Sequence, residues 1–359
     1  MENSPRKQPL VILGSGATAL VTAAYLTSQG HPITLCDLPP YQPVFEQLTK
    51  QKGILLRGAS GVTGLKNPYC ITHDIQQALS HSYQVLVCTS AGRHQSIAQW
   101  CAPFLTPEHC VLLVPGNAGS ILMRHIFEEM GVSEKTIVGE ISDNLWACRV
   151  TGPGEVLAAL PIKPKKAAAY RCADTPKLIQ AFEPFFPLLP AANILETTLN
   201  SPNVITHVVG SVLNAVQIEN RGSEFAFFQH GLSRSVIDCT QAVEDERDRI
   251  LRHLGLTAYG KVTALSRKLL LEPEHQGFQL FRQLDGPDSL SHRYISEDAS
   301  CGMALLVSIA IEYNLPCPMS NAALAFASCF HNVDYLAVGR TLKNLKLSGY
   351  SVPQLLSLL

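Results

Sequence analysis

The stretch Leu10-Val-Ile-Leu-Gly-Ser-Gly-Ala-Thr-Ala19 decides the fold of this chain. Its four apolar residues, Leu10 to Leu13, predict a strand covered on both faces, as in a parallel sheet. The next six residues match G-x-G-x-x-A, in which the first glycine permits a tight turn and the second lets the backbone approach a pyrophosphate. The helix that follows presents free N–H groups to the phosphates at its N-terminus. The sequence therefore predicts that a dinucleotide contacts Gly14, Ser15, Gly16, Ala17 and Thr18.

A second predicted strand ends at Cys36, and Asp37 lies about 20 residues after Gly16, where such folds place a carboxylate on the adenosine ribose. A carboxylate there accepts hydrogen bonds from the ribose hydroxyls and repels a 2′-phosphate. No arginine follows Asp37 in Leu38-Pro39-Pro40. We therefore expect NAD(H) as the cofactor, with NADP(H) as the second choice. The alternative is a solvated aspartate after a strand.

Short apolar runs continue to alternate with helical patterns up to about Ile141, which predicts a doubly wound parallel sheet. Small residues follow two of these runs, at Thr89 and Ala91 and again at Asn117. Ligands bind at the carboxyl ends of parallel strands, so these three residues are expected beside the nicotinamide. The alternative is that both segments are connecting turns. Residues 148–163, with Gly-Pro-Gly at 152–154, predict an added hairpin.

Beyond Pro190 the pattern changes to helices. Ser201 and Pro202 form an N-cap and first-turn pair at the start of a long apolar helix, 203–219. We predict an α/β Rossmann domain over 1–190 and an all-α C-terminal domain over 191–359. Further helices are expected at 235–254, 258–271, 301–313 and 321–330.

Composition excludes several classes of function. The 28 Lys and Arg balance 29 Asp and Glu, whereas a nucleic-acid binder needs clustered positive charge. The eleven cysteines form no C-x-x-C pair, which argues against a disulfide framework or a metal site, and we expect reduced core thiols. The apolar run 10–26 is interrupted at 14–16 and the run 303–311 is short, so neither a signal peptide nor a membrane span is expected. The protein should be cytoplasmic, and its low charge, 16%, suggests a hidden interface.

One polar stripe runs along the apolar helix that starts near Asn203. Asn203, His207, Gly210, Ser211 and Asn214 recur at spacings of three and four, which places them on one face. An imidazole flanked by small residues has space for a ligand and can act as an acid or base near neutral pH. From the helix alone, a core histidine bonded to a carbonyl is the favoured interpretation.

A second polar cluster spans His292 to Asp298. Arg293 could hold a substrate carboxylate through a forked contact, and a carboxylate from this cluster could orient an imidazole. The alternative is a solvated helix start capped by Asp298.

These segments together resemble the opine dehydrogenases, the family of octopine, nopaline and N-(1-carboxyethyl)norvaline dehydrogenases. The resemblance implies a Rossmann domain and an α-helical domain with the active site in the cleft between them. It places His207 on the catalytic histidine of the family, Asp298 on its partner and Arg293 on an arginine that meets substrate carboxylate. The matching segments, in order, are 14–19, 114–117, 146–149, 203–207 with 213–214, 231–236, 293–298 and 339–342.

The family condenses the amine of an amino acid with a 2-oxo acid and reduces the imine with NADH or NADPH to a secondary-amine dicarboxylate. By resemblance, His207 exchanges protons with the carbinolamine or imine, while Asp298 holds the ring in the useful tautomer. The sequence departs from the family at Val208, where proline is common, and at 225–230, which is usually rich in tyrosine. An imine reductase for a preformed or cyclic imine therefore stays open. A non-enzymatic NAD-binding sensor is the alternative from another class, and a homodimer is expected from the family.

Overall fold

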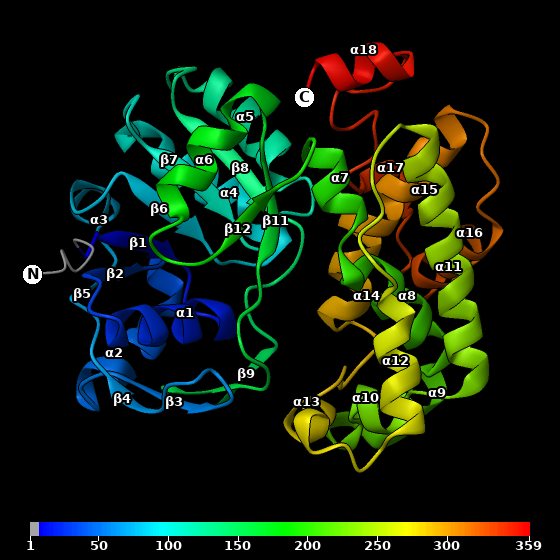
Figure 1. Cartoon of the computed structure of the whole chain (residues 1–359), viewed down its shortest axis with the longest axis horizontal. Coiled ribbons are helices and arrows are strands. Elements are labelled where there is room, and N and C mark those ends of the chain that lie inside the picture. Colours follow the sequence, from blue (N-terminus) through cyan, green and yellow to red (C-terminus); the bar gives the residue numbers. More distant parts are fainter. Residues whose placement is uncertain (1–6) are drawn as a thin grey trace, which may run out of the picture. The chain divides into compact units, whose positions relative to one another are not determined.

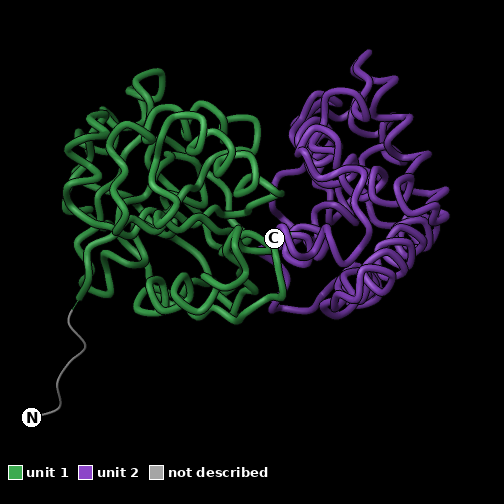
Figure 2. Tube along the Cα trace, turned by 90° about the horizontal axis from the view of Figure 1, so that it is seen from above, with its two compact units in different colours: residues 1–194 green, residues 195–359 purple. Residues whose placement is uncertain are grey.

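The computed structural model describes residues 7–359. It consists of two compact units, Met1–Ile194 and Leu195–Leu359 (Figure 2). The sequence predicts the boundary after residue 190, which is the last residue of the short strand β12 (Leu188–Pro190). The observed boundary follows Ile194.

A mostly parallel sheet forms the centre of the first unit (Figure 1). Strand β1 pairs in parallel with both β2 and β6, as the apolar run 10–13 predicts. Strand β11 pairs antiparallel with β8 at one side, which the sequence does not foretell. Within the described chain the sheet has eight strands, in the spatial order β12 (Leu188–Pro190), β11 (Lys165–Ala169), β8 (Ile137–Ile141), β7 (Cys110–Leu113), β6 (Gln84–Val87), β1 (Leu10–Leu13), β2 (Ile33–Cys36) and β5 (Cys70–Thr72).

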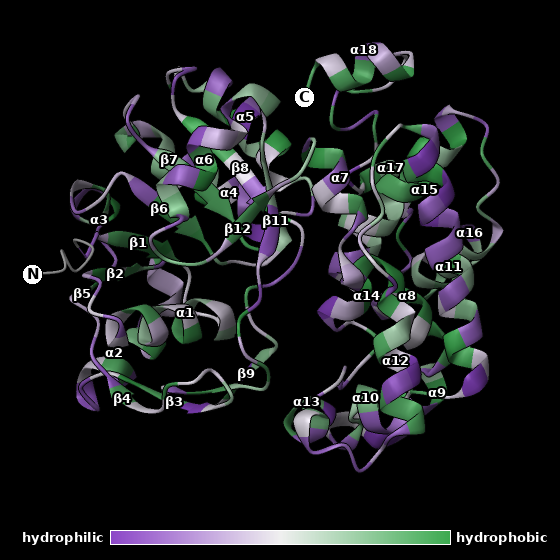
Figure 3. Cartoon of the chain, viewed as in Figure 1, coloured by the Kyte–Doolittle hydropathy of each residue, from purple (hydrophilic) through white to green (hydrophobic). Residues whose placement is uncertain are grey.

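Both faces of this sheet are buried. Leu10 and Ile12 pack into one apolar cluster, whereas Val11 and Leu13 pack into another. Alternate side chains of a strand point to opposite faces, so continuous apolarity is what two covered faces require. Figure 3 shows the hydrophobic colour on β1 and its neighbours. The helices of this unit are α1 (Ala17–Ser28), α2 (Gln42–Lys50), α3 (Ile75–Ser80), α4 (His94–Cys101), α5 (Gly119–Glu129) and α6 (Thr175–Phe182).

The hairpin expected over 148–163 forms, but it belongs to a separate sheet. Its two strands pair antiparallel, and β10 also pairs in parallel with β3, about a hundred residues earlier. In the part of the chain described, this second sheet has the order β4 (Gly64–Lys66), β3 (Ile54–Gly58), β10 (Glu155–Ala158) and β9 (Cys148–Gly152).

The second unit contains helices and, within its described residues, no strand. The helix predicted over 203–219 is broken at Asn214, whose side-chain nitrogen donates to the carbonyls of Gly210 and Gly231 at 2.8 and 3.0 Å. Ser201 occupies the N-cap of α8 as predicted, but its hydroxyl makes no capping hydrogen bond. The helices are α7 (Ile194–Leu199), α8 (Pro202–Leu213), α9 (Ala215–Arg221), α10 (Phe227–His230), α11 (Arg234–His253), α12 (Val262–Leu271), α13 (Gln279–Arg282), α14 (Arg293–Asp298), α15 (Ala304–Glu312), α16 (Pro318–His331), α17 (Tyr335–Val338) and α18 (Val352–Ser357).

The apolar run 303–311 is the second half of a longer helix. Helix α14, a π-helical turn at Ala299–Met303 and α15 form one continuous helix over Arg293–Glu312. Its mean hydropathy of 1.3 and its 20 residues would suffice to cross a membrane, contrary to the expectation from the run alone. However, 78% of its apolar window is buried inside the fold, where it packs against α8 and α16. It is a core helix.

All eleven cysteines lie in the described chain, and all are free. Seven are buried, as expected for core thiols, whereas Cys172 and Cys329 are exposed. Burial raises the pKa of the Cys101 thiol to about 12. A thiol with such a pKa stays protonated at neutral pH and is inert as a nucleophile or metal ligand.

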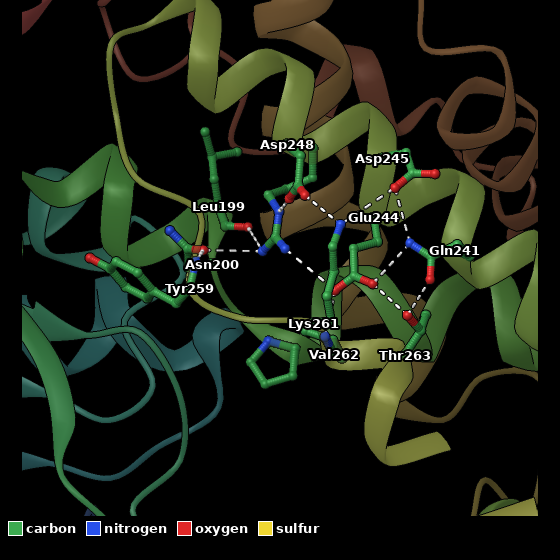
Figure 4. Close-up of polar contacts among 12 residues, drawn as sticks. Leu199, Asn200, Gln241, Glu244, Asp245, Asp248, Tyr259, Lys261, Val262 and Thr263 are labelled. Atoms are coloured by element: carbon green, nitrogen blue, oxygen red, sulfur yellow. Dashed lines mark hydrogen bonds and ion pairs between the residues drawn. The ribbon is translucent and has the colours of Figure 1, made fainter. Parts of the chain in front are cut away.

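A fully buried arginine, Arg247 of α11, anchors the turn that precedes α8. Its guanidinium donates to the side chain of Asn200 at 3.1 Å and to the carbonyl of Leu199 at 3.5 Å. The same group pairs with Asp248 at 2.7 Å and with Glu244 at 3.5 Å. Figure 4 shows these acceptors around one point between α11 and the chain that leads into α8. The start of α8 is therefore held by a buried charge network.

We predict that Arg247→Ala lowers the free energy of unfolding by about 3–5 kcal/mol, because it leaves the buried carboxylate of Glu244 without its cation. Urea-induced unfolding measures this loss. The matched control is Arg267→Ala, since Arg267 is 46% exposed and lies 3.5 Å from Asp238. That change should alter stability by less than about 0.5 kcal/mol. Equal effects of the two variants would contradict the anchoring role.

Candidate active site

The residues predicted to hold a dinucleotide come together at one edge of the central sheet. Strands β2, β1, β6 and β7 are adjacent and parallel, so their carboxyl ends meet at this edge. Gly14, Asp37, Thr89 and Asn117 each lie just beyond one of these ends. The strands β2 and β5 lie on one side of β1, whereas β6 and β7 lie on its other side. The chain therefore reverses the direction in which it adds strands at β1, and sheets of this kind bind ligands at such a topological switch point.

The two glycines of the first turn, Gly14 and Gly16, have different surroundings. Gly14 has φ +128°, and a Cβ on it would lie 2.4 Å from the carbonyl oxygen of Cys88. The fold itself therefore requires glycine at this position. A Cβ on Gly16, the N-cap of α1, would meet no protein atom within 4 Å. The open space at Gly16 fits a pyrophosphate that approaches the backbone at the N-terminus of α1.

Asp37 is fully buried, and both of its carboxylate oxygens accept hydrogen bonds. Its Oδ2 accepts from the hydroxyl of Ser15 at 2.7 Å, and its Oδ1 accepts from the backbone N–H of Leu38 at 2.8 Å. The Arg93 guanidinium forms an ion pair with the same Oδ1. Arg93 follows β6, so it is distant from Asp37 in the sequence. Sequence reasoning looked only at residues 38–40 and missed this cation.

Two further loops line the same edge. Ala91 starts a 3₁₀ turn after β6, while Asn117 is buried with φ +52° after β7. The Oγ1 atom of Thr89 is buried and has no hydrogen-bond partner within residues 7–359. Glu140 of β8 accepts from the backbone N–H groups of Ala118 and Ser120, both at 3.1 Å, and thereby caps α5. The sequence analysis did not identify Glu140, which reaches the loop only through the pairing of β7 with β8.

In the helical unit, His207 of α8 contacts Asp298 of α14. The two atoms Nδ1 and Oδ2 lie 2.8 Å apart, and the side chains are only 9% and 2% exposed. A carboxylate on Nδ1 fixes the ring so that Nε2 is the nitrogen that can exchange a proton with a substrate. The partner of Nδ1 is thus a carboxylate, and not the carbonyl expected from the helix alone.

Aromatic rings hold the imidazole on two sides. Tyr294 stacks on it with the ring centroids 3.5 Å apart and the planes within 10°. Phe227 approaches at 6.2 Å and 80°, in an edge contact. A Cβ on Gly210 would lie 2.5 Å from Cζ of Phe227. The small residue at 210 thus makes room for Phe227 and not, as its spacing suggested, for a ligand.

The remaining predicted site residues have distinct surroundings. Asn203 is partly buried one turn before His207 on α8. Arg293, on α14 with Asp298, has a 46% exposed side chain and an Nε atom 3.3 Å from Glu297. Asn214 is buried, and both hydrogens of its amide nitrogen are used on backbone carbonyls. No group of three or more His, Cys, Asp or Glu that could hold a metal ion occurs in residues 7–359.

Comparison with known proteins agrees with this geometry. Residues 190–331 match the NAD/NADP octopine/nopaline dehydrogenase, alpha-helical domain, and residues 10–158 match ketopantoate reductase PanE/ApbA. The chain is 30% identical to the opine dehydrogenase of Arthrobacter sp. strain 1C over 353 residues, which cover 94% of this chain and 95% of the relative. The chain belongs to the opine dehydrogenase family.

More distant members match over much of their length. Vitopine synthase of Allorhizobium ampelinum is 23% identical over 77% of this chain and 78% of its own. A solved structure of octopine dehydrogenase with NADH and L-arginine has a TM-score of 0.67 at 17% identity and covers 98% of both chains. The NADP⁺-bound yersinopine dehydrogenase has a TM-score of 0.65 at 15% identity, over 98% of this chain and 97% of its own.

These findings confirm the fold class, with a Rossmann-like α/β domain before a helical domain. They also confirm the resemblance to opine dehydrogenases. The protein is an NAD(P)-dependent oxidoreductase that acts on CH–NH donors and carries out an NAD(P)H-dependent reductive condensation. The imine reductase and the non-enzymatic sensor are not favoured.

We predict that Gly16→Ala leaves thermal unfolding nearly unchanged but weakens NADH binding by about tenfold or more, since the added methyl group would meet no protein atom and would enter the space expected for the pyrophosphate. Gly14→Ala is the matched comparison. It should destabilise the fold by about 3 kcal/mol or more, because its φ is strained for alanine and the added Cβ would lie 2.4 Å from the carbonyl oxygen of Cys88. Calorimetry and NADH fluorescence titration measure the two effects. NADH affinity unchanged in Gly16→Ala would argue against the pyrophosphate position.

Proposed function

We propose that the protein condenses the amine of an amino acid with a 2-oxo acid, with proton transfer by His207 and Asp298 and with NAD(H) as the preferred cofactor. The observation that carries this proposal is the 2.8 Å contact between the imidazole of His207 and the buried carboxylate of Asp298. Solved octopine dehydrogenases contain L-arginine in one case and pyruvate in another, which supports these two substrate classes.

The edge of the central sheet has the features that a nicotinamide dinucleotide needs. The first turn of α1 would hold the pyrophosphate, and Asp37 would accept a ribose hydroxyl. The nicotinamide would lie at the loops after β6 and β7. When bound, it supplies the hydride that reduces the imine carbon. The proposed contacts are Gly14, Ser15, Gly16, Ala17, Thr18, Asp37, Thr89, Ala91 and Asn117.

The condensation requires several proton transfers, which we assign to Nε2 of His207. The amine nitrogen attacks the 2-oxo carbon, and one of its protons must move to the former carbonyl oxygen as the carbinolamine forms. Loss of the hydroxyl as water then needs a proton delivered to that oxygen. An imidazole with one nitrogen held by Asp298 can accept a proton from nitrogen and pass it to oxygen in each of the two transfers, so that both amine protons leave in the water and the imine forms. Asp298 remains ionised and stabilises the imidazolium formed between the two steps.

Tyr294 and Phe227 keep the imidazole in this orientation. The flat stack on Tyr294 leaves the ring little freedom to rotate, and its π face favours the protonated imidazole. Phe227 closes a second side. Little conformational entropy of the imidazole therefore has to be lost during the reaction.

For the substrate carboxylates, we propose Arg293 as the principal contact. Its half-exposed guanidinium lies on the same helix as Asp298, and an arginine holds a carboxylate through two parallel hydrogen bonds. Asn203, one turn before His207, is a second candidate. Asn214 was the third, but its engaged amide nitrogen supports a role in ending α8.

We also propose that the protein works in the cytoplasm as a homodimer. The eleven free cysteines suit a reducing compartment, and the low charged fraction suits a buried subunit interface. No nucleic acid, membrane or metal is part of the proposal.

The decisive experiment is a substrate screen. Purified protein is incubated with each amino acid in combination with pyruvate, glyoxylate, oxaloacetate or 2-oxoglutarate. The absorbance of NADH is followed, and the mass of each product is determined by mass spectrometry. We expect NADH oxidation only when both substrates are present, with a product equal to their sum minus water plus two hydrogens. Oxidation with a cyclic imine alone would support an imine reductase instead, and no turnover with any of them would support a sensor.

We predict that His207→Ala lowers kcat by about 10²–10⁴-fold, the range for a positioned acid–base group, while NADH affinity stays nearly unchanged. Asp298→Asn keeps the shape but removes the charge that supports the imidazolium, so a loss of similar order is expected. The double variant should be little worse than the worse single variant, because residues acting as a unit are non-additive. Losses that multiply in the double variant would contradict a joint role.

A further inference from the structure

We propose that Arg93 sets the cofactor selectivity of this protein: by pairing with Asp37 it cancels the charge that would exclude a 2′-phosphate, so NADPH is accepted beside NADH. The proposal rests on the nucleotide site proposed above. It concerns a residue that lies far from Asp37 in the sequence but beside it in the fold.

The buried carboxylate of Asp37 is nearly saturated with hydrogen bonds. A carboxylate offers about four acceptor positions. Ser15, Leu38 and Arg93 donate to three of them. About one position therefore remains, and it is not open to solvent because the Asp37 side chain is 0% exposed, so a ribose hydroxyl gains at most one direct hydrogen bond there. The usual advantage of NAD(H) at such an aspartate is correspondingly reduced.

Arg93 also changes the electrostatics of this position. An unpaired aspartate would repel a phosphate that carries nearly two negative charges. In this structure the guanidinium lies directly against the carboxylate, so the pair presents little net charge to a ligand. Both groups lie at the carboxyl edge of the sheet, because Asp37 follows β2 and Arg93 follows β6.

The guanidinium has donors left for a phosphate. Arg93 is 20% exposed at its side chain, and its centre lies 4.0 Å from the ring centroid of Tyr41. Its guanidinium donates to Asp37 alone within residues 7–359, whereas an arginine has five N–H groups. A guanidinium stacked on a tyrosine and partly open to solvent is pre-ordered for a forked contact with phosphate oxygens.

The test is a fluorescence titration of NADH and NADPH with the full-length protein and its variants. For the wild type we expect NADH to bind more tightly than NADPH, by about tenfold at most. Arg93→Gln, which keeps a polar stem but removes the charge, should weaken NADPH by about 10–100-fold relative to NADH. Arg93→Lys should retain much of the NADPH affinity. Asp37→Asn, which releases the guanidinium, should tighten NADPH relative to NADH.

The matched control is Arg57→Ala, since Arg57 belongs to the same unit but is 59% exposed and pairs with Glu155. It should leave both dissociation constants unchanged. An NADPH-to-NADH ratio in Arg93→Gln within twofold of the wild type would overturn the role of Arg93. Wild-type protein that binds neither nucleotide would instead overturn the proposed nucleotide site, and the inference with it. If Arg93→Gln fails to fold, Arg93→Met, which keeps the long stem beside Tyr41 but carries no charge, is measured in its place with the same twofold criterion.

Discussion

The hydrogen bond between Asp298 and Nδ1 of His207 is the constraint on which the helical unit depends. A carboxylate with only 2% of its side chain exposed is costly to bury without a partner, so α8 and α14 must meet in the register that supplies the imidazole. Helix α14 is fixed because it continues through a π-helical turn into the core helix α15. Helix α8 is fixed at its start, where the buried Arg247 holds Leu199 and Asn200. The imidazole of His207 therefore lies between two helices whose positions are fixed by contacts in the core.

The nucleotide-binding unit uses a related device for a different purpose. There too a carboxylate, Asp37, is buried at the end of an element, and there too a side chain distant in the sequence compensates it. The partners differ in chemistry: an imidazole gains and loses a proton near neutral pH, whereas a guanidinium stays charged. A pair with an imidazole suits proton transfer. A pair with a guanidinium suits the binding of an anionic or neutral ligand, and so the choice of partner separates a reactive site from a recognition site.

How much the sequence predicts depends on how local the physical signal is. The strand and turn at 10–16 are local, because four apolar residues and two glycines in fixed positions suffice, and the structure confirms them. The second sheet was missed because β3 and β4 are partly exposed, because β4 has only three residues, and because β10 pairs with β3 across a long stretch of chain. The break at Asn214 also depends on a remote acceptor, the carbonyl of Gly231.

Site residues divide in the same way. His207 stands out on its helix, and the 292–298 cluster suggests a carboxylate for an imidazole, but nothing in the spacing shows that Asp298 will reach His207, and the family resemblance was needed to name the pair. The stripe of small residues predicted space for a ligand beside Gly210, but Phe227 fills that space. Phe227 comes from a later helix, so the spacing along α8 gives no sign of it. Tyr294 belongs to the predicted polar cluster 292–298, but the sequence assigned it no role. Its stacking on His207 cannot be inferred before α14 is placed against α8.

The residues proposed for proton transfer and the residue proposed for cofactor selectivity thus differ in how well the sequence reveals them. The proposed chemistry uses an imidazole and a carboxylate whatever the substrate, and a family resemblance pointed to both. The role proposed for Arg93 depends on one contact, and several positions around a loop could supply the same cation. No fixed spacing is then required, which leaves no pattern to recognise. A three-dimensional structure is therefore needed most for selectivity, even where fold and reaction follow from the sequence.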